Sequence, residues 1–333
     1  MKRGESGLSL LVAVDKPVGM SSHDVVNRAR RIFGERRVGH TGTLDPMASG
    51  VLPLCVGPAT RLDQYLTGHD KSYRVDITFG FETTTDDAQG EPTTVGEPGA
   101  ALFDEAQARA FVVTTIGTHE QVPPQYSAIK VNGKKAYEVA RKGGQTALTP
   151  RTIEIYDADL CACCVDAQTG LPVWSVDFSV SKGTYIRSLA RDIGRALGCP
   201  AHVSALRRLN VGAITLEECV SLETLEQQGT AAVLDPVAAL GFRYAFCDEA
   251  EKPLLAGAKL PTSAIALNEP PVLGEALGLS TCTSSVIPSV EAPRDGELAS
   301  MVLGNRLKAL YSYSASSDAW KPACVFSIPI ARN

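Results

Sequence analysis

The order of apolar and polar residues predicts three strands and three helices in the first two-thirds of the chain. Residues 73–79 and 174–180 alternate between apolar and polar positions, which is typical of strands with one buried face. The apolar run 8–14 predicts a buried strand, because it is too short to span a membrane and ends without a signal-peptide cleavage site. Helical spacing predicts helices that begin near Ser21 and Ile186, and a further helix around 103–116. This irregular alternation favours an α+β fold over a doubly wound sheet.

Two other segments have a different composition. Residues 82–100 are acidic and rich in Gly, Pro and Thr, which predicts a loop exposed to solvent. Beyond about residue 245, short apolar runs at 301–303, 307–313 and 323–326 predict strands, separated by loops such as 284–297. We therefore expect a large domain over 1–245 and a small β-rich domain over 246–333.

The charge is acidic overall but unevenly distributed. The 333 residues include 32 Lys+Arg and 37 Asp+Glu, for a net charge of −5, and 44% hydrophobic with 21% charged residues excludes a disordered chain or a coiled coil. A negative net charge argues against a nucleic-acid partner. However, residues 76–109 hold 8 acidic residues and 1 basic residue, whereas 121–151 hold 6 basic residues and 1 acidic residue. A local basic surface that binds RNA is therefore compatible with the negative net charge of the whole chain.

The pattern of the nine cysteines indicates in which cellular compartment the protein resides. Cys161 and Cys164 are spaced as a C-x-x-C pair, but this cluster has no second half and no histidine at zinc spacing. We expect reduced thiols in a soluble cytoplasmic protein without a bound metal.

The segment 39–50, Gly-His-Thr-Gly-Thr-Leu-Asp-Pro-Met-Ala-Ser-Gly, carries candidate chemistry. Taken alone, an Asp-Pro pair flanked by glycines is typical of a simple turn. Pro46 nevertheless restricts Asp45 to extended backbone angles, and the glycines let the chain bend around it. A rigid loop that presents a carboxylate and the imidazole of His40 suits a catalytic site.

This segment resembles the catalytic signature of the TruB family of pseudouridine synthases, which isomerise uridine-55 of tRNA. Four further motif regions resemble the family in the expected order, at 11–22, 70–75, 121–138 and 181–189, and 202–208 follows at the expected place. The resemblance implies a pseudouridine synthase fold, with a mixed, mostly antiparallel central sheet flanked by helices and a small PUA-like C-terminal domain. It also implies that 121–151 is an RNA-gripping thumb.

The resemblance assigns roles residue by residue. Asp45 matches the catalytic aspartate, Tyr73 the active-site tyrosine and Arg187 the arginine that pairs with the aspartate. His40 matches the histidine of the flipped-base site. Alone, Tyr73 is typical of a core aromatic residue and Arg187 of a solvated helix arginine. The remaining substrate-binding candidates are Lys16, Lys134, Lys135, Tyr185, Leu206, Arg207 and Arg208.

Three functions stay open at this point. The first is a monomeric tRNA pseudouridine synthase that needs no cofactor, metal or obligatory protein partner, with a secondary role as a tRNA-folding chaperone. The second is a non-catalytic RNA-binding or chaperone protein, which the joint presence of Asp45, Tyr73 and Arg187 disfavours. The third is an RNA-guided pseudouridine synthase, which the basic thumb disfavours, because a guide RNA can take over the grip on the substrate.

Overall fold

The computed structural model describes residues 6–131, 133–273 and 286–332, and the chain divides into two compact units. The first unit comprises residues 1–46, 50–68 and 210–333, and the second comprises 47–49 and 69–209. Part of the loop predicted at 284–297 lies outside the described residues, as does Cys282.

The second unit is built on a sheet with the strand order β12-β4-β11-β10-β7. These strands are β12 (Ala201–Val211), β4 (Lys71–Phe79), β11 (Pro172–Val180), β10 (Arg151–Val165) and β7 (Gly117–Gln121). The two strands predicted from alternation, β4 and β11, are confirmed and pair antiparallel, with Tyr73 opposite Phe178. Their buried side chains alternate with more exposed ones because one face packs on the core.

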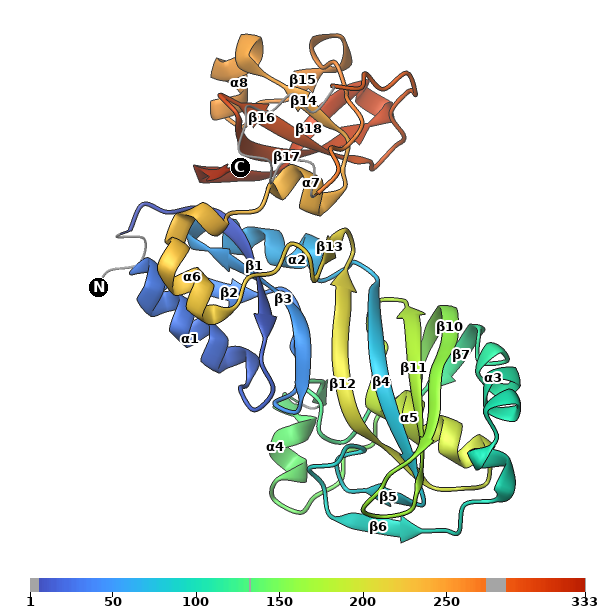
Figure 1. Cartoon of the computed structure of the whole chain (residues 1–333). Helices are drawn as coiled ribbons and strands as arrows, with labels where there is room; N and C mark the ends of the chain where they lie inside the picture. The colour runs from blue at the N-terminus through green and yellow to red at the C-terminus, as the bar shows by residue number, and fades with distance from the viewer. Residues whose placement is uncertain (1–5, 132, 274–285, 333) are drawn as a thin grey trace. The chain divides into compact units, whose positions relative to one another are not determined.

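Helices and short strands complete the second unit (Figure 1). The predicted helices are confirmed as α3 (Glu105–Val113), which packs against β10, and α5 (Ile186–Ala196), which packs against β4. The shorter elements are β5 (Phe81–Thr83), β6 (Pro92–Val95), β8 (Lys130–Val131), β9 (Lys134–Lys135) and α4 (Ala136–Ala140).

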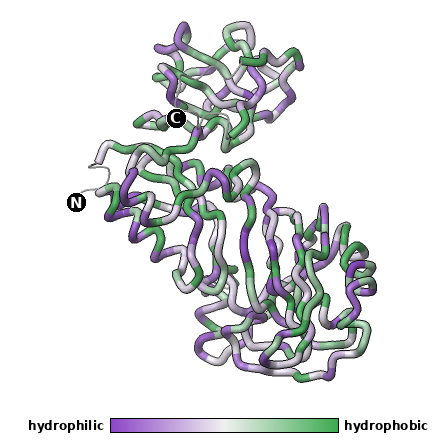
Figure 2. Tube along the Cα trace, in the orientation of Figure 1, coloured by the Kyte–Doolittle hydropathy of each residue, from purple (hydrophilic) through white to green (hydrophobic). Residues whose placement is uncertain are grey.

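The first unit begins with a strand, a capped helix and a pair of strands. β1 (Leu10–Lys16) pairs antiparallel with β3 (Ala48–Val56), which also pairs with β2 (Val38–His40). α1 (Ser22–Phe33) starts with a capping box, in which the side chains of Ser21 and Asp24 accept each other's backbone N–H. It ends at Gly34, whose φ of 59° suits a residue without a Cβ. The colours alternate along α1 in Figure 2, as expected for an amphipathic helix.

The C-terminal strands of the first unit form a second sheet in the order β14-β16-β17-β18-β15. Within this sheet β14 and β16 run parallel and the other neighbours run antiparallel, and the strands predicted at 301–303, 307–313 and 323–326 are confirmed. The strands are β14 (Tyr244–Phe246), β15 (Leu260–Pro261), β16 (Leu298–Leu303), β17 (Arg306–Ser314) and β18 (Ala319–Ala331). The rest of this unit contains α2 (Asp63–Leu66), β13 (Ile214–Thr215), α6 (Leu222–Gln228), α7 (Pro236–Leu240), α8 (Glu251–Leu255) and the 3₁₀ helix η1 (Gly57–Leu62).

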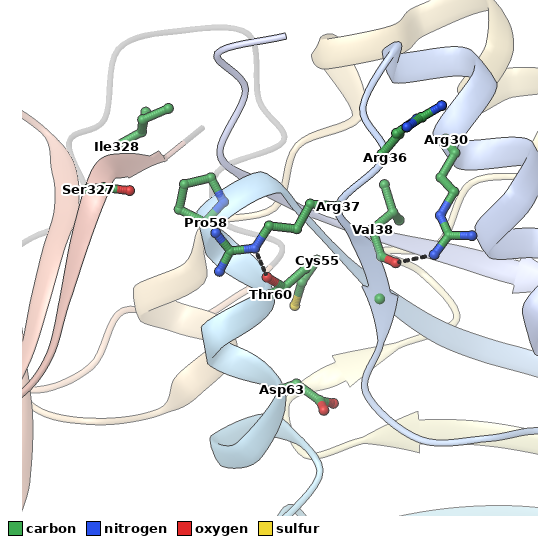
Figure 3. A pocket seen from close by; sticks show the side chains of 11 residues that line it. Arg30, Arg36, Arg37, Val38, Cys55, Pro58, Thr60, Asp63, Ser327 and Ile328 are labelled. Atoms are coloured by element: carbon green, nitrogen blue, oxygen red, sulfur yellow. Dashed lines mark hydrogen bonds between the residues drawn. The ribbon is translucent and has the colours of Figure 1, made fainter. Parts of the chain in front are cut away.

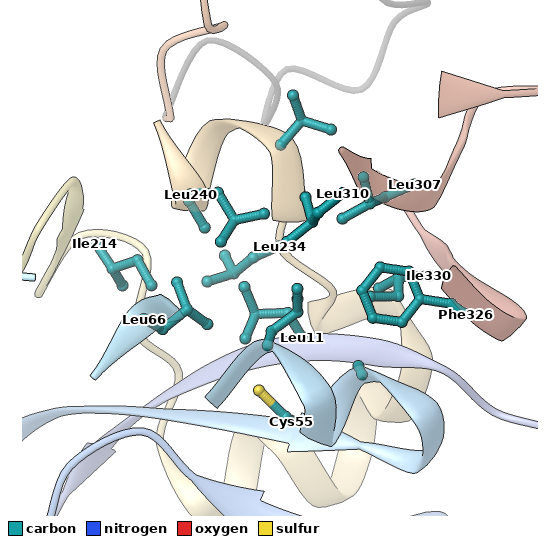
Figure 4. Packing of buried hydrophobic residues seen from close by; sticks show 14 of the residues in the cluster. Leu11, Cys55, Leu66, Ile214, Leu234, Leu240, Leu307, Leu310, Phe326 and Ile330 are labelled. Atoms are coloured by element: carbon teal, nitrogen blue, oxygen red, sulfur yellow. The ribbon is translucent and has the colours of Figure 1, made fainter. Parts of the chain in front are cut away.

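A single hydrophobic cluster joins the two sequence ends of the first unit (Figure 4). It contains Leu11 of β1 and Leu66 of α2, together with Leu310 and Phe326 of the C-terminal sheet, all buried. Because apolar burial is the main favourable term in folding, this cluster makes the N-terminal strands and the C-terminal sheet depend on each other. The division at residue 245 that the sequence suggests stays a prediction.

The architecture confirms the predicted α+β class, with mostly antiparallel sheets flanked by helices and a β-rich C-terminal region. In the part of the chain that the structure describes, every cysteine is a free thiol. None of the helices in that part is both long enough and apolar enough to cross a membrane.

Truncation of Phe326 tests the shared cluster. We expect Phe326→Ala to lower the free energy of unfolding by about 3–5 kcal/mol, because a fully buried ring is replaced by a cavity. Hydrogen exchange should speed up at the amides of β1 as well as those of β17. Val290→Ala, at a side chain that is 97% exposed, is the control and should change neither quantity. Faster exchange confined to residues after 245 would contradict a shared core.

Candidate active site

The loop that carries Asp45 is held on both sides by backbone hydrogen bonds. The hydroxyl of Ser22, at the start of α1, accepts a hydrogen bond from Leu44 N at 2.8 Å and donates to Leu44 O at 2.9 Å. On the other side, Gly19 N donates to Pro46 O at 2.7 Å. Asp45 itself is half-buried. These contacts fix the backbone immediately before and after the predicted catalytic carboxylate.

His40 ends β2, in register with Leu54 of β3, and is oriented by the same loop. Its Nδ1 accepts a hydrogen bond from Gly42 N at 3.3 Å, which leaves the ring proton on Nε2 in the neutral imidazole. Gly42 has a φ of 142°, a conformation that a residue with a side chain rarely adopts. Glycine at position 42 therefore lets the loop turn back onto the imidazole.

Lys16 is fully buried at the end of β1. Its ammonium group donates to Pro17 O at 2.9 Å and to Met20 O at 2.6 Å, and so organises the turn that leads to α1. A contact between this ammonium group and an RNA phosphate would require it to leave these carbonyls. That contact stays a prediction.

The three arginines of α5 each meet a carboxylate from the segment 82–87. Arg187 Nη1 lies 3.6 Å from Asp87 Oδ2, Arg191 Nη1 lies 2.9 Å from Asp86 Oδ2, and Arg195 binds Glu82 through two bonds of 2.8 Å. The side chains of Arg187 and Arg191 are only 7% and 10% exposed. We call this set of three pairs the arginine ladder.

This arrangement corrects the prediction of a solvent-exposed loop for residues 82–87, whereas most of 88–100 is exposed, as predicted. Glu82, Asp86 and Asp87 are buried, because each carboxylate is neutralised by an arginine of α5. Asp86 has a φ of 59°, a left-handed conformation that aspartate tolerates better than most residues. Burial raises the pKa of Asp86, and Arg191 opposes that effect. Thr85 supports the turn by donating its hydroxyl to Asp87 Oδ1 at 2.6 Å.

The arginine ladder also binds the base of the thumb, residues 121–151. Arg187 Nη2 donates to Tyr126 O at 2.9 Å, and Arg191 Nη2 donates to Val122 O at 2.9 Å. Arg187 Nη1 also donates to Thr85 O at 2.8 Å. The guanidinium of Arg187 therefore ties three separate segments, α5, the 82–87 turn and the thumb, in one fixed orientation.

The residue before α5 is fixed from the thumb side as well. Gln121, which is buried, accepts a hydrogen bond from Tyr185 N at 2.9 Å and donates to Tyr185 O at 3.1 Å. Tyr185 is half-buried and Leu206 on β12 is buried. Tyr73 on β4 is also buried, with 7% of its surface exposed.

The outer part of the thumb presents cations around one aromatic ring. Tyr137 lies between Lys135, whose Nζ is 5.4 Å from the ring centroid, and Arg141, whose Cζ is 5.3 Å from it. Lys130, Arg141 and Lys142 are exposed. Lys134 belongs to β9, but its side chain lies outside the described part of the chain. A flat ring flanked by cations suits contact with RNA.

Two further predicted cations occupy β12. Arg207 is half-buried and donates through Nη1 to Ser49 Oγ at 3.2 Å, whereas Arg208 is almost completely buried. Burial lowers the pKa of Lys71, at the start of β4, to about 8, and Arg208 adds to this effect. The second unit therefore buries Lys71 close to Arg208, a feature that sequence patterns did not indicate.

The predicted residues are distributed over both units. Lys16, His40 and Asp45 belong to the first, and the second contains Tyr73, Lys134, Lys135, Tyr185, Arg187, Leu206, Arg207 and Arg208. The sequence analysis missed Ser22, Gln121 and the carboxylates of the ladder. The sequence does contain a signal for the carboxylates of the ladder. Arginines four residues apart lie on one face of a helix, and they need carboxylate partners if that face is buried. Among the described residues, no group of three His, Cys, Asp or Glu side chains could hold a metal ion.

Comparison with known proteins places the chain among sequence relatives. Residues 30–186 match a family model described as TruB family pseudouridylate synthase, N-terminal domain, and residues 187–237 match one described as tRNA pseudouridylate synthase B C-terminal domain. The chain is 45% identical over 242 residues to tRNA pseudouridine synthase B of Burkholderia mallei (strain NCTC 10247), covering 72% of this chain and 76% of that protein. It is 46% identical over 225 residues to the protein of the same name from Bacillus velezensis, covering 67% and 72%.

Solved structures show the same fold. The chain is similar to a structure of an H/ACA ribonucleoprotein bound to a substrate RNA containing 2′-deoxyuridine, with a TM-score of 0.65, 22% identity, and coverage of 96% of this chain and 85% of that one. It is also similar to an archaeal box H/ACA Nop10–Cbf5 complex, with a TM-score of 0.63, 23% identity, and coverage of 95% and 86%. At this identity the similarity shows the fold.

Removal of one ladder arginine tests the ladder. We expect Arg191→Met to lower the free energy of unfolding by about 3–5 kcal/mol, because Asp86 is then buried without its partner. Addition of Asp86→Asn should recover part of that loss by removing the unpaired charge. The control is Arg109→Met, at an exposed ion pair with Glu105, which should cost less than about 1 kcal/mol in urea unfolding. Equal costs at the two sites would contradict a buried ladder.

The pH dependence of stability tests the packing next to the ladder. His202 stacks on Phe81, and burial lowers the pKa of its imidazole below the usual 6.5. The unfolded chain therefore binds a proton that the folded chain excludes, so this contribution is complete above pH 6.5 and is lost as the pH falls toward the folded-state pKa. In urea unfolding at pH 7.5 and 5.5, the stability advantage of wild type over His202→Gln should shrink at pH 5.5. An advantage that grows at pH 5.5 would contradict a neutral, buried imidazole.

Proposed function

The chain belongs to the TruB family of pseudouridylate synthases, and on that premise we propose that it acts on the uridine at position 55 in the T-loop of tRNA. As a member of this family it isomerises uridine to pseudouridine in tRNA. The observation that supports the proposal most is the fixed backbone around Asp45, which Ser22 and Gly19 hold through Leu44 and Pro46. Such a loop presents one carboxylate in a constant position.

The reaction explains why a single carboxylate suffices. The N1–C1′ glycosidic bond breaks, the uracil turns, and the base rejoins the sugar through C5. Positive charge develops on the sugar as the bond breaks, and the carboxylate of Asp45 stabilises or traps it, as in glycoside hydrolysis. A glycosidase uses a second carboxyl group to activate water. In this enzyme water would leave an abasic product, so the proposed site excludes it.

Arg187 and Tyr73 complete the proposed catalytic set. In a dry site Asp45 must stay ionised, and a neighbouring guanidinium favours the charged form of a carboxylate. The fixed orientation of Arg187, held by Thr85 O and Tyr126 O, supports this role. Tyr73 is proposed to accept or relay the proton that leaves C5 in the last step.

The remaining predicted residues are proposed to bind the RNA. The target uridine is stacked in its loop and must be flipped out, and the imidazole of His40 can stack in the vacated position. Tyr185 and Leu206 are proposed to contact the flipped nucleotide. Phosphate contacts, which depend strongly on salt, are assigned to Lys16, Lys134, Lys135, Arg207 and Arg208. The two cations that flank the ring of Tyr137 support an RNA-gripping role for the thumb.

The alternative of an RNA-guided enzyme is weaker. The solved H/ACA complexes share the fold at 22–23% identity, whereas the two tRNA pseudouridine synthase B proteins named above are 45% and 46% identical. We therefore propose a stand-alone, monomeric and cytoplasmic enzyme that needs neither a guide nor a cofactor or metal. Residues 1–245 are proposed to form its catalytic domain and 246–333 a PUA-like domain.

Replacement of Asp45 tests the catalytic assignment. We expect Asp45→Asn to lower the rate of pseudouridine formation at position 55 by more than about 10⁴-fold, because the amide cannot stabilise or trap the sugar cation. Its affinity for the tRNA should stay close to that of the wild type, since the backbone contacts of the loop are unchanged. Asp159→Asn, at an exposed side chain, makes the same chemical change and should have wild-type activity. Turnover by Asp45→Asn near the wild-type rate would overturn the assignment.

A further inference from the structure

A cleft of about 970 Å³ lies within the first unit (Figure 3). Arg30 of α1 and Arg36 and Arg37, which precede β2, line it together with Thr60 of η1. Ser327 and Ile328 of β18 also line it, so the C-terminal sheet contributes to the same cleft. None of these three arginines belongs to the substrate-binding set derived from the sequence.

Carboxylates do not neutralise the three arginines that line the cleft. In the part of the chain that the structure describes, Arg30, Arg36 and Arg37 have no ion-pair partner, whereas Arg28, Arg243 and Arg332 of the same unit each bind a carboxylate. Arg31, Arg61 and Arg306 of this unit also lack an ion pair with any described residue, but they do not line the cleft. Asp63 is the one carboxylate among the described residues that line the cleft. The lining is therefore net positive, in a protein whose total charge is −5.

Two of these guanidinium groups are held in place by neutral partners. Arg37 Nε donates to Thr60 Oγ1 at 2.7 Å, and Thr60 Oγ1 donates to Gly57 O at 2.8 Å. Arg30 donates to Asn27 Oδ1 at 2.9 Å and to Val38 O at 3.4 Å, and its Nε is buried without a hydrogen-bond partner. Arg36 is exposed. Positioned guanidinium groups without counter-charges are suited to bind phosphate oxygens.

The position of the cleft favours RNA as its ligand. Gly39 lines the cleft and is followed in β2 by His40, so the cleft borders the strand that also carries a predicted substrate-binding residue. The arginines sit at several positions around a volume much larger than one phosphate, which suits a run of phosphodiesters. We propose that this cleft binds the sugar-phosphate backbone of the same tRNA whose uridine is isomerised. This inference rests on the proposed function, and it adds a second anchoring site to it.

The test compares the full-length protein with two variants. In Arg30→Gln/Arg36→Gln two cleft charges are removed, and Arg31→Gln is the matched control, because Arg31 is exposed on the same helix but does not line the cleft. Affinity for an unmodified tRNA transcript is measured over a series of salt concentrations. We expect the double variant to bind about tenfold more weakly, and the slope of log affinity against log salt to fall in magnitude by roughly 1.5. Arg31→Gln should bind nearly as tightly as wild type, and thermal unfolding verifies that all three proteins are folded.

The two proposals fail separately. The proposal that the cleft binds RNA is wrong if the folded double variant keeps the affinity and salt slope of the wild type. It is also wrong if Arg31→Gln loses as much affinity as the double variant. Either result leaves the proposed function supported if the wild type forms pseudouridine. If the wild type binds tRNA but makes no pseudouridine, the proposed function is wrong. A selective loss of affinity in the double variant would then still support the cleft as an RNA site.

Discussion

The charge pairing between α5 and residues 82–87 is the constraint on which the geometry of the second unit depends. A buried guanidinium is tolerated only when a carboxylate or several carbonyls satisfy it, and Arg187 and Arg191 each have both kinds of partner. Because these carbonyls belong to the 82–87 turn and to the base of the thumb, the position of the helix sets the positions of both. A candidate catalytic arginine is thereby held before any RNA arrives, which is the preorganisation that an electrostatic catalyst requires.

In the first unit, uncharged groups hold the backbone around the candidate catalytic residue in place. Ser22 and Gly19 hold the backbone on either side of Asp45, and a hydrophobic cluster that includes Leu11 and Phe326 packs the same unit. Hydrogen bonds to the backbone at Leu44 and Pro46 therefore fix the position of the loop that carries the candidate carboxylate. The cleft near Arg37 gathers three arginines without carboxylate partners among the described residues around one cavity, with Asp63 as the one acidic residue in its described lining.

Local patterns predicted most of the regular elements and missed the pairing between them. β4 and β11 alternate because one face of each is buried, and α1 begins at a cap that is evident in Ser21 and Asp24. The acidic composition of 82–87 is typical of an exposed loop, yet its partners are arginines about 100 residues away, a distance that no periodicity reports. The hydrogen bonds between the Ser22 hydroxyl and the Leu44 backbone could not be predicted for the same reason, because the two residues are 22 positions apart. The roles of Asp45, Tyr73 and Arg187 follow from the order of motifs and stay predictions.

The most direct test of the central claim is to incubate the purified full-length protein with an unmodified tRNA transcript, without added metal or cofactor, and to map pseudouridine along the product. We expect pseudouridine at position 55 of the T-loop, formed without strand cleavage or an abasic site. Absence of pseudouridine, or its formation only at other positions, would contradict the proposed function.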